Sequence, residues 1–160
     1  MSAAALRQLV TFRLGVDHFA ADIYAVERVL RYQLPTPIPN TPRWIEGVID
    51  YQNQVVPVIS LRRRFELEMV EAKLETRILV FNTSHGWIGA VVDAVLEVIA
   101  VTPEQLAPPP KLFRGLSAEY LLGLVRRDKR LVVCLDVTRL LTAEEQMALQ
   151  DVKTESLAKA

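Results

Sequence analysis

The chain alternates short apolar runs with polar turns, a pattern typical of β-strands. Residues 9–14 and 18–21 form two such runs around a turn at residues 15–17. Residues 47–65, GVIDYQNQVVPVISLRRRF, hold two apolar runs that flank the polar segment 50–54. This stretch predicts a β-hairpin. Several short strands with frequent turns predict a small β-barrel and a mostly β fold.

Two segments between these strands have other patterns. Ile23, Val26 and Leu30 follow i, i+3, i+7 spacing, which is compatible with one or two helical turns. Residues 34–42, LPTPIPNTP, contain four prolines. Because proline lacks a backbone N–H, it is excluded from helix interiors and central strands. This segment is therefore predicted to be an edge strand or an extended crossing segment.

The apolar pattern of the first half recurs in the second half. Residues 9–30 align without a gap on residues 78–99, and residues 47–65 align on residues 123–141. The identical pairs include Phe12 with Phe81, Ala21 with Ala90, Gly47 with Gly123 and Val56 with Val132. Two ungapped blocks in the same order indicate an internal repeat.

The repeat predicts one domain, residues 1–160, with a first barrel from residues 9–65 and a second barrel from residues 78–141. A half of about 70 residues has a marginal hydrophobic core on its own. The two barrels are therefore expected to share a substantial apolar interface.

Two further segments lie outside the repeat. Residues 66–77 are rich in charge and are predicted to form an exposed connector. Thr142 and Glu145 have the spacing of a capping box, which predicts a short C-terminal helix over residues 142–155 with a frayed end.

The composition is that of a globular domain without a charge bias. The 160 residues are 51% hydrophobic, and 19 basic side chains balance 19 acidic ones. A net charge of zero gives no overall attraction to nucleic acid or to an anionic membrane. The most apolar stretch, residues 87–101, is interrupted by Asp93 and Glu97 and is too short to span a bilayer. Since the N-terminus also lacks a convincing signal peptide, a soluble, cytoplasmic protein without membrane insertion is expected.

No arrangement of residues predicts catalysis, a cofactor site or a metal site. His18 and His85 lie near equivalent turns of the two repeats, and no cluster of histidine, cysteine and acid has metal-ligand spacing. The single cysteine, Cys134, cannot form an internal disulfide, and its apolar neighbours favour a core side chain over a nucleophile. The chain is therefore predicted not to be an enzyme.

Two basic clusters leave one alternative open. Arg62 to Arg64 and Arg126 to Arg130 are rich in arginine, and small β-barrels do bind nucleic acid. That binding mode also needs exposed aromatic side chains among the charges, and Tyr51 is the only aromatic at a hairpin tip beside either cluster. A solvated surface is favoured, and a nucleic-acid-binding barrel is the alternative.

Three ordered segments resemble those of one known family. Residues 38–49, IPNTPRWIEGVI, resemble its Pro-x-x-Pro-x-x-Ile-x-Gly-Val segment. Residues 55–65 resemble its Val-Ile-Pro-Val-Ile-Asp-Leu-Arg-x-x-Phe segment, and residues 86–98 resemble its Gly-Leu-Val-Val-Asp-x-Val-x-Glu-Val segment. With these motifs, residues 9–65 and 78–141 resemble the CheW-type coupling domain of bacterial chemosensory systems.

The resemblance implies two SH3-like, five-stranded β-barrels that share an apolar seam, and a non-enzymatic adaptor as the function. Proteins of this type link the cytoplasmic tips of methyl-accepting chemoreceptors to the regulatory domain of the histidine kinase CheA, in ring-like arrays. These two partners, and association with the membrane through receptor arrays, are therefore expected for this chain. Binding to nucleic acid is not.

The chain departs from the family at the hairpin tip. The family reads Asn-Leu-Arg-Gly there, whereas residues 50–53 read Asp-Tyr-Gln-Asn. Asn53 tolerates the positive φ that suits the family's glycine, so the turn can survive. The family's arginine is tied to receptor coupling and pairs with a glutamate; its position is Gln52, and that of the glutamate is Arg28. Because both partners are changed together, neither leaves a charge without its partner.

By this resemblance, the predicted partner-binding residues are Gln52, Asn53, Tyr51, Arg28, Glu27, Val29 and Arg62. The hypothesis is an auxiliary or divergent coupling protein with weakened or altered receptor docking and retained kinase docking on the first barrel. Besides the nucleic-acid alternative, a fragment that competes with a true adaptor for the kinase is also compatible with the sequence.

Overall fold

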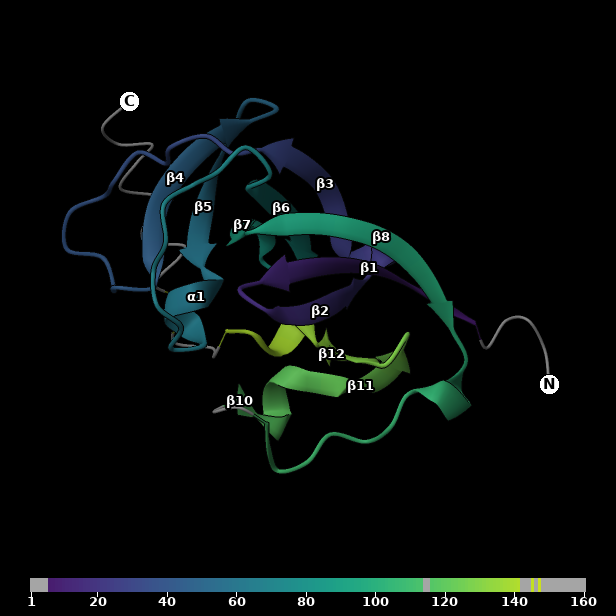
Figure 1. Ribbon diagram of the computed structural model, residues 1–160. Helices are drawn as coiled ribbons and strands as arrows, with labels where there is room; N and C mark the ends of the chain where they lie inside the picture. Colours follow the sequence, from purple (N-terminus) through teal and green to yellow (C-terminus); the bar gives the residue numbers. More distant parts are fainter. Residues whose placement is uncertain (1–5, 114–115, 142–144, 146, 148–160) are drawn as a thin grey trace.

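The computed structural model describes residues 6–113, 116–141, 145 and 147, and most of its strands form two five-stranded sheets (Figure 1). In order of pairing, the first sheet contains β11 (Leu121–Arg127), β12 (Arg130–Leu135), β2 (Asp17–Asp22), β1 (Arg7–Leu14) and β8 (Ala94–Val101). The second sheet contains β3 (Val26–Arg31), β6 (Arg77–Thr83), β7 (Gly86–Val92), β5 (Gln54–Ser60) and β4 (Ile45–Tyr51). The predicted mostly β fold with two five-stranded units is confirmed.

Short helical turns and a two-stranded sheet complete the described part. They are α1 (Leu61–Arg64), the 3-10 turns η2 (Ile23–Ala25), η3 (Pro103–Gln105), η4 (Ala118–Tyr120) and η5 (Val137–Arg139), and the pair β9 (Leu112–Phe113) and β10 (Leu116–Ser117). The helix predicted over residues 142–155 lies outside the described residues, except for Glu145 and Met147. Within the described residues, no helix has the length and apolar character needed to cross a membrane.

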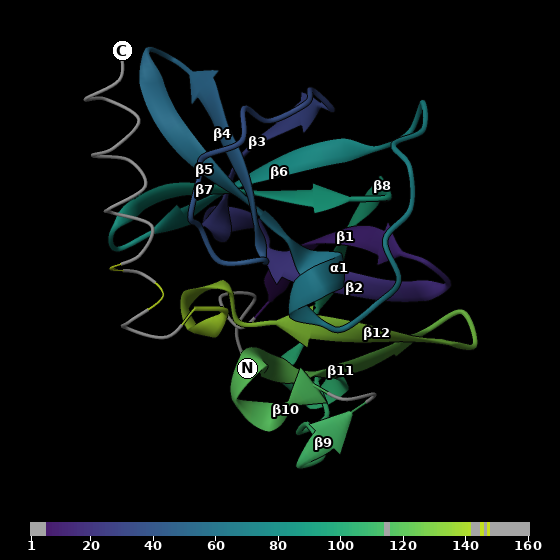
Figure 2. The ribbon, with the colours of Figure 1, turned by 90° about the vertical axis from the view of Figure 1, so that its left-hand side faces the viewer.

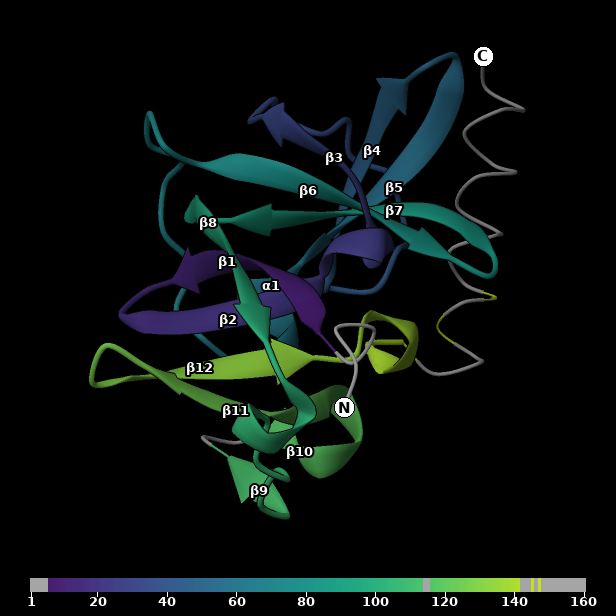
Figure 3. The ribbon, with the colours of Figure 1, turned by 90° about the vertical axis from the view of Figure 1, so that its right-hand side faces the viewer.

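The two halves of the chain exchange strands, which corrects the predicted barrel boundaries of residues 9–65 and 78–141. The β1–β2 hairpin of the first half joins β8, β11 and β12 of the second half, whereas the β6–β7 hairpin joins β3, β4 and β5. The exchange follows from η2, where the chain leaves β2 in the first sheet and enters β3 in the second (Figure 3). Repeated strands share one sequence pattern, so the pattern alone does not say which copy each strand pairs with.

The segment predicted to hold one or two helical turns contains only one. Ile23 to Ala25 form η2, whose first N–H groups include that of Tyr24, donated to the Asp22 carboxylate at 2.9 Å. The following residues are a strand because Val26 and Val29 pair with Phe81 and Leu79 of β6. Pairing in the sheet therefore overrides the helical spacing.

An apolar seam joins the two sheets, as predicted. The largest core cluster contains side chains from both sheets, among them Phe12, Phe19, Ile59, Phe81 and Ile88. Phe12 and Phe81, which coincide in the repeat, are both fully buried. Two smaller clusters lie outside the seam, one in each sheet. Since burial of a large apolar side chain contributes about 1.5–3 kcal/mol, the shared seam supplies much of the stability that a half lacks alone.

The proline-rich segment crosses the sheet edge and explains the repeated glycines. Thr36 forms a backbone bridge with Val48 on β4, which confirms an extended crossing segment. A Cβ on Gly47 would lie 2.3 Å from the carbonyl oxygen of Thr36. The same contact recurs at Gly123, where a Cβ would lie 2.5 Å from the carbonyl oxygen of Ala107. Both edge strands therefore need glycine because another backbone passes against them.

Candidate functional site

The β4–β5 hairpin ends in a two-residue turn, closed by the pair Tyr51 and Gln54. Gln52 has φ 47° and Asn53 has φ 63°, so both turn residues are in the left-handed region, as in a type I′ turn. The prediction that Asn53 accommodates a positive φ is confirmed. A positive φ at Gln52 was not predicted, and it is less favourable because glutamine tolerates this region less well than glycine or asparagine.

Tyr51 is the centre of a cluster at this end of the second sheet. Its side chain is buried, and its ring packs against Trp87 with the centroids 4.9 Å apart. The Tyr51 hydroxyl donates to Oε2 of Glu27 at 3.4 Å, and Cζ of Arg28 lies 6.0 Å from the ring centroid. The register of β3 against β6 shifts between Val26 and Arg28, a β-bulge that brings adjacent Glu27 and Arg28 toward one ring. We call Glu27, Arg28, Tyr51 and Trp87 the tip cluster.

The structure therefore brings together most of the predicted partner-binding residues. Gln52 and Asn53 form the exposed turn next to Tyr51, and Val29 follows Arg28 on β3 with 40% of its surface exposed. The sequence did not predict a role for Trp87, because its only signal was its place in an apolar run. Its indole N–H donates to Oδ1 of Asn82 at 3.0 Å, which fixes the ring beside Tyr51.

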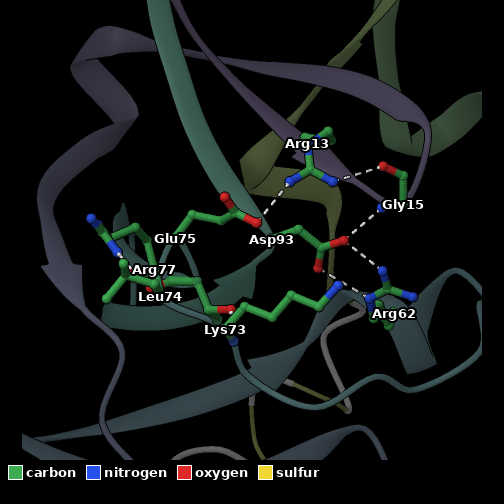
Figure 4. Close-up of polar contacts among 9 residues, drawn as sticks. Arg13, Gly15, Arg62, Lys73, Leu74, Glu75, Arg77 and Asp93 are labelled. Atoms are coloured by element: carbon green, nitrogen blue, oxygen red, sulfur yellow. Dashed lines mark hydrogen bonds and ion pairs between the residues drawn. The ribbon is translucent and has the colours of Figure 1, made fainter.

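Arg62 lies on α1 and contacts Asp93 rather than the tip cluster. Figure 4 shows Arg62 and Asp93 with their polar contacts. Its Nε and Nη2 donate to Oδ1 and Oδ2 of Asp93 at 3.2 Å and 2.5 Å. The backbone N–H of Gly15 donates to the same carboxylate at 2.7 Å. Asp93 thus ties α1 to the turn between β1 and β2, and Arg62 has a structural role that its sequence position did not reveal.

The Asp93 carboxylate is ionised more readily than an ordinary aspartate. Burial alone would raise its pKa, but the hydrogen bonds from Arg62 and Gly15 and the positive charges of Arg62 and Arg13 outweigh burial and lower the pKa. Both side chains of the pair are largely shielded, with 13% of Arg62 and 16% of Asp93 exposed. The pair is therefore a fixed internal contact.

The interior contains no activated cysteine. Cys134 is buried in the core of the first sheet, and burial raises the pKa of its thiol to about 12, although the charge of Arg7 opposes the rise. Almost none of the thiol is ionised near neutral pH, so it is a poor nucleophile. This agrees with the prediction of a core side chain.

Comparisons with known proteins agree with this geometry. The CheW-like domain matches residues 8–145 of the chain. The chain is 36% identical over 145 residues to the chemotaxis protein CheW of Klebsiella aerogenes, covering 91% of this chain and 87% of that protein. It is 32% identical over 151 residues to the chemotaxis protein CheW of Treponema pallidum, with 91% and 88% covered. The crystal structure of the scaffolding protein TtCheW from Thermoanaerobacter tengcongensis superposes with a TM-score of 0.80 at 27% identity, covering 87% of this chain and 90% of that one.

The matched region runs from β1 to Glu145, so it includes both sheets, the seam and the tip cluster. The resemblance found in the sequence motifs is thereby confirmed over most of the chain. The chain belongs to the CheW-like domain family and is a non-enzymatic adaptor of chemosensory signalling.

Proposed function

We propose that this adaptor couples the cytoplasmic tips of chemoreceptors to the regulatory domain of CheA, with receptor docking that differs from that of typical relatives. The tip cluster carries this proposal. It gathers Glu27, Arg28 and Tyr51 at the end of the second sheet, beside the turn residues Gln52 and Asn53. These are the positions at which the chain departs from the family, or their direct neighbours.

The departure changes the charge that a receptor would meet. Arg28 is exposed and cationic at the position where the family has a glutamate, and Gln52 is neutral where the family has an arginine. In place of that ion pair, Arg28 lies over the Tyr51 ring and Glu27 accepts the Tyr51 hydroxyl. The tip is therefore internally satisfied, and a receptor that complements the family's charges would meet Arg28 instead.

The proposed docking residues are accordingly fewer than the sequence suggested. We retain Gln52, Asn53, Tyr51, Arg28, Glu27 and Val29 as the receptor-facing set. Arg62 is withdrawn from it, because its guanidinium is held by Asp93. In the cell, docking to receptors would place the adaptor at the membrane through its partners.

Binding of the full chain to purified CheA regulatory domain and to receptor-tip fragments tests the proposal. We expect binding to the kinase domain and weak binding to a receptor tip that a typical CheW relative binds tightly. The relative serves as the positive control in both assays. Absence of binding to both partners would contradict the proposed coupling role, and receptor affinity equal to that of the relative would contradict altered docking.

A further inference from the structure

The end of the β11–β12 hairpin carries a local excess of positive charge. Residues 126–130 read Arg-Arg-Asp-Lys-Arg, and all five are exposed. We call this segment the basic tip. The arginine cluster on α1 is different, because Arg62 and Arg64 are each paired with a carboxylate of the chain. On a chain without net charge, the basic tip is therefore a surface of distinct chemistry.

The basic tip places two like charges opposite each other. Arg127 and Arg130 are register partners on the two strands and close the two-residue turn. Like charges directly opposite on neighbouring strands destabilise a sheet. The equivalent pair of the first hairpin, Tyr51 and Gln54, is neutral. Neutral side chains would suit the turn better, so folding does not explain the charges of the basic tip.

The chain neutralises this charge only in part. Nε of Arg127 lies 3.9 Å from Oε2 of Glu97. The other three cationic side chains of the basic tip have no ion pair and no side-chain hydrogen bond within the part of the chain that the structure describes. With Asp128 in the turn itself, four cations meet two carboxylates. Exposed guanidinium and ammonium groups at the tip therefore remain accessible to an anionic partner.

A hollow of about 90 Å³ lies beside the basic tip, where β12 runs along β2 (Figure 3). Its walls include Arg127, Arg130 and His18. One water molecule takes up about 30 Å³ in the liquid, so the hollow has room for a carboxylate group. Burial and the charges of Arg130 and Arg13 lower the pKa of His18, although Asp17 opposes the fall. The positive charge of the tip thus extends to β2.

We propose that the basic tip binds an acidic segment of a partner protein, rich in aspartate and glutamate. A carboxylate in the hollow lies next to both Arg127 and Arg130 and relieves their mutual repulsion. Further carboxylates of the segment pair with the exposed side chains of Arg126 and Lys129. The partner is a protein because the chain is an adaptor of a signalling assembly.

Nucleic acid and an anionic membrane fit the basic tip less well. Small barrels bind nucleic acid with exposed aromatic side chains, and residues 121–135 contain none. Glu97 and Asp128 also line the hollow and repel a backbone that carries a charge at every nucleotide, whereas a peptide can hold its carboxylates away from them. A lipid surface attracts a broad basic face, and this charge is confined to one hairpin end.

The site does not rest on the proposed receptor and kinase contacts, since the basic tip belongs to the first sheet and the tip cluster to the second. The probe is a short acetylated and amidated peptide of alternating glutamate and serine, titrated into the ¹⁵N-labelled full chain. We expect the backbone N–H resonances of residues 126–130 to shift and the indole N–H resonance of Trp87 to stay. The same peptide with glutamine in place of glutamate should bind at least about tenfold more weakly. Salt should weaken binding of the glutamate peptide, because exposed charges are screened.

Substitutions locate the binding surface. The tip variant combines Arg126→Gln, Lys129→Gln and Arg130→Gln and should bind the glutamate peptide at least about tenfold more weakly. Its Tm should not fall, because it loses no ion pair and removes the repulsion between Arg130 and Arg127.

A control variant removes the same amount of charge elsewhere. It combines Arg31→Gln, Arg43→Gln and Lys111→Gln, three exposed cations outside the basic tip. Its affinity for the glutamate peptide should stay within about twofold of that of the natural chain, because the net charge alone does not bind the peptide.

Four results would overturn the proposal. They are unshifted resonances of residues 126–130 at millimolar glutamate peptide, equal affinity for the two peptides, a tip variant that binds no more weakly than the control variant, and an affinity that salt does not change. Two further arms use a short oligothymidylate and vesicles of phosphatidylcholine with phosphatidylserine. Tighter binding of either than of the glutamate peptide, lost in the tip variant, would assign the basic tip to polyphosphates or to membranes and would likewise reject the proposal.

Discussion

The hairpins β4–β5 and β11–β12 have the same backbone and carry different chemistry. The two turn residues have φ of 47° and 63° at Gln52 and Asn53, and of 50° and 66° at Asp128 and Lys129. In Figure 2 the β4–β5 hairpin points to the top of the view and the β11–β12 hairpin points to the right, so the two turns lie far apart. Neither turn contains a glycine, and each holds one residue, Gln52 or Lys129, that tolerates a positive φ less well than its neighbour Asn53 or Asp128. The pairing of the flanking strands therefore helps to set this geometry.

The side chains around the two turns are not equivalent. At the first, Tyr51 is buried among Trp87, Glu27 and Arg28. At the second, Arg127 takes the position of Tyr51 and Glu97 that of Arg28; their ion pair is 3.9 Å long, with 43% and 58% of the side chains exposed. One tip is packed and the other is open. Features shared by the repeats therefore report on folding, whereas the different side chains at the two tips are candidates for function.

Substitution of the repeated glycines should reduce stability most, and by a similar amount in both halves of the chain. We expect Gly47→Ala and Gly123→Ala each to lower the free energy of unfolding by about 3 kcal/mol or more, because the new Cβ would meet a backbone carbonyl oxygen within 2.5 Å. Chemical denaturation measures this. Gly15→Ala is the control: its φ is positive, as is that of Gly47 but not that of Gly123, and the closest atom is the end of the Arg62 side chain at 3.9 Å, so it should cost about 1 kcal/mol. Equal costs at all three glycines would contradict the crossing-segment explanation.

The Arg62–Asp93 pair has no counterpart in the other repeat, where Thr138 and Tyr24 take these positions. We expect Arg62→Gln to lower the free energy of unfolding by about 2 kcal/mol, because it leaves the shielded Asp93 carboxylate with the Gly15 N–H as its hydrogen-bond donor among the described residues. Thr138→Ala, on the equivalent turn of the second repeat, is the matched control and should cost less. If Arg62→Gln lowered the free energy of unfolding no more than Thr138→Ala does, the two repeats would not differ in stability at this position.

The Arg62–Asp93 pair predicts that the stability of the fold depends on pH. The folded-state pKa of Asp93 is lowered, so the folded state binds its proton less readily than the unfolded state. Its contribution to stability is therefore complete above the unfolded pKa of about 3.8 and is lost as the pH falls through the lower folded pKa. Asp93→Asn should reduce the stability difference between pH 7 and pH 2.5. An unchanged difference would show that other carboxylates carry the acid sensitivity.

The shared features were those that the sequence predicted well. The coincidence of Phe12 with Phe81 and of Gly47 with Gly123 located the seam and the hairpins, because burial and close backbone approach restrict the residue types allowed. The exchange of strands was not predicted. β8 and β3 have the same apolar pattern, and only the three-dimensional path through η2 decides that β3 pairs with β6.

The candidate site was predicted in part. The resemblance located Gln52 and Arg28, but the role of Arg62 depends on Asp93, which lies 31 positions away and belongs to another strand connection. Trp87 on β7 meets Tyr51 on β4 across the one intervening strand, β5. The bulge that brings Glu27 and Arg28 together has no sequence signal of its own. Contacts between distant side chains depend on register, which periodicity does not determine.

The charges of the packed tip should control receptor affinity. Gln52→Arg alone should change receptor binding by less than about twofold, because Arg28 opposes the new charge. Arg28→Glu with Gln52→Arg should bind a receptor tip about tenfold more tightly, since it restores the glutamate and the arginine that the family resemblance implies at these two positions. Titration calorimetry with receptor fragments measures this, and unchanged affinity for the CheA regulatory domain is the control. Equal receptor affinity of the double variant and the natural chain would contradict altered docking.

The ion pair of Glu97 and Arg127 at the open β11–β12 tip should have the smallest interaction energy. A double-mutant cycle of Glu97→Gln and Arg127→Gln should yield a coupling energy below about 0.5 kcal/mol that vanishes at high salt, because both side chains are exposed and 3.9 Å apart. The cycle of Arg28→Gln and Tyr51→Leu at the packed tip should yield about 0.5–1 kcal/mol, since the cation lies over a buried ring. If the Glu97–Arg127 coupling were the larger of the two, the second tip would not be an open surface. The contrast between the hairpins would then lie in the identity of their charges alone.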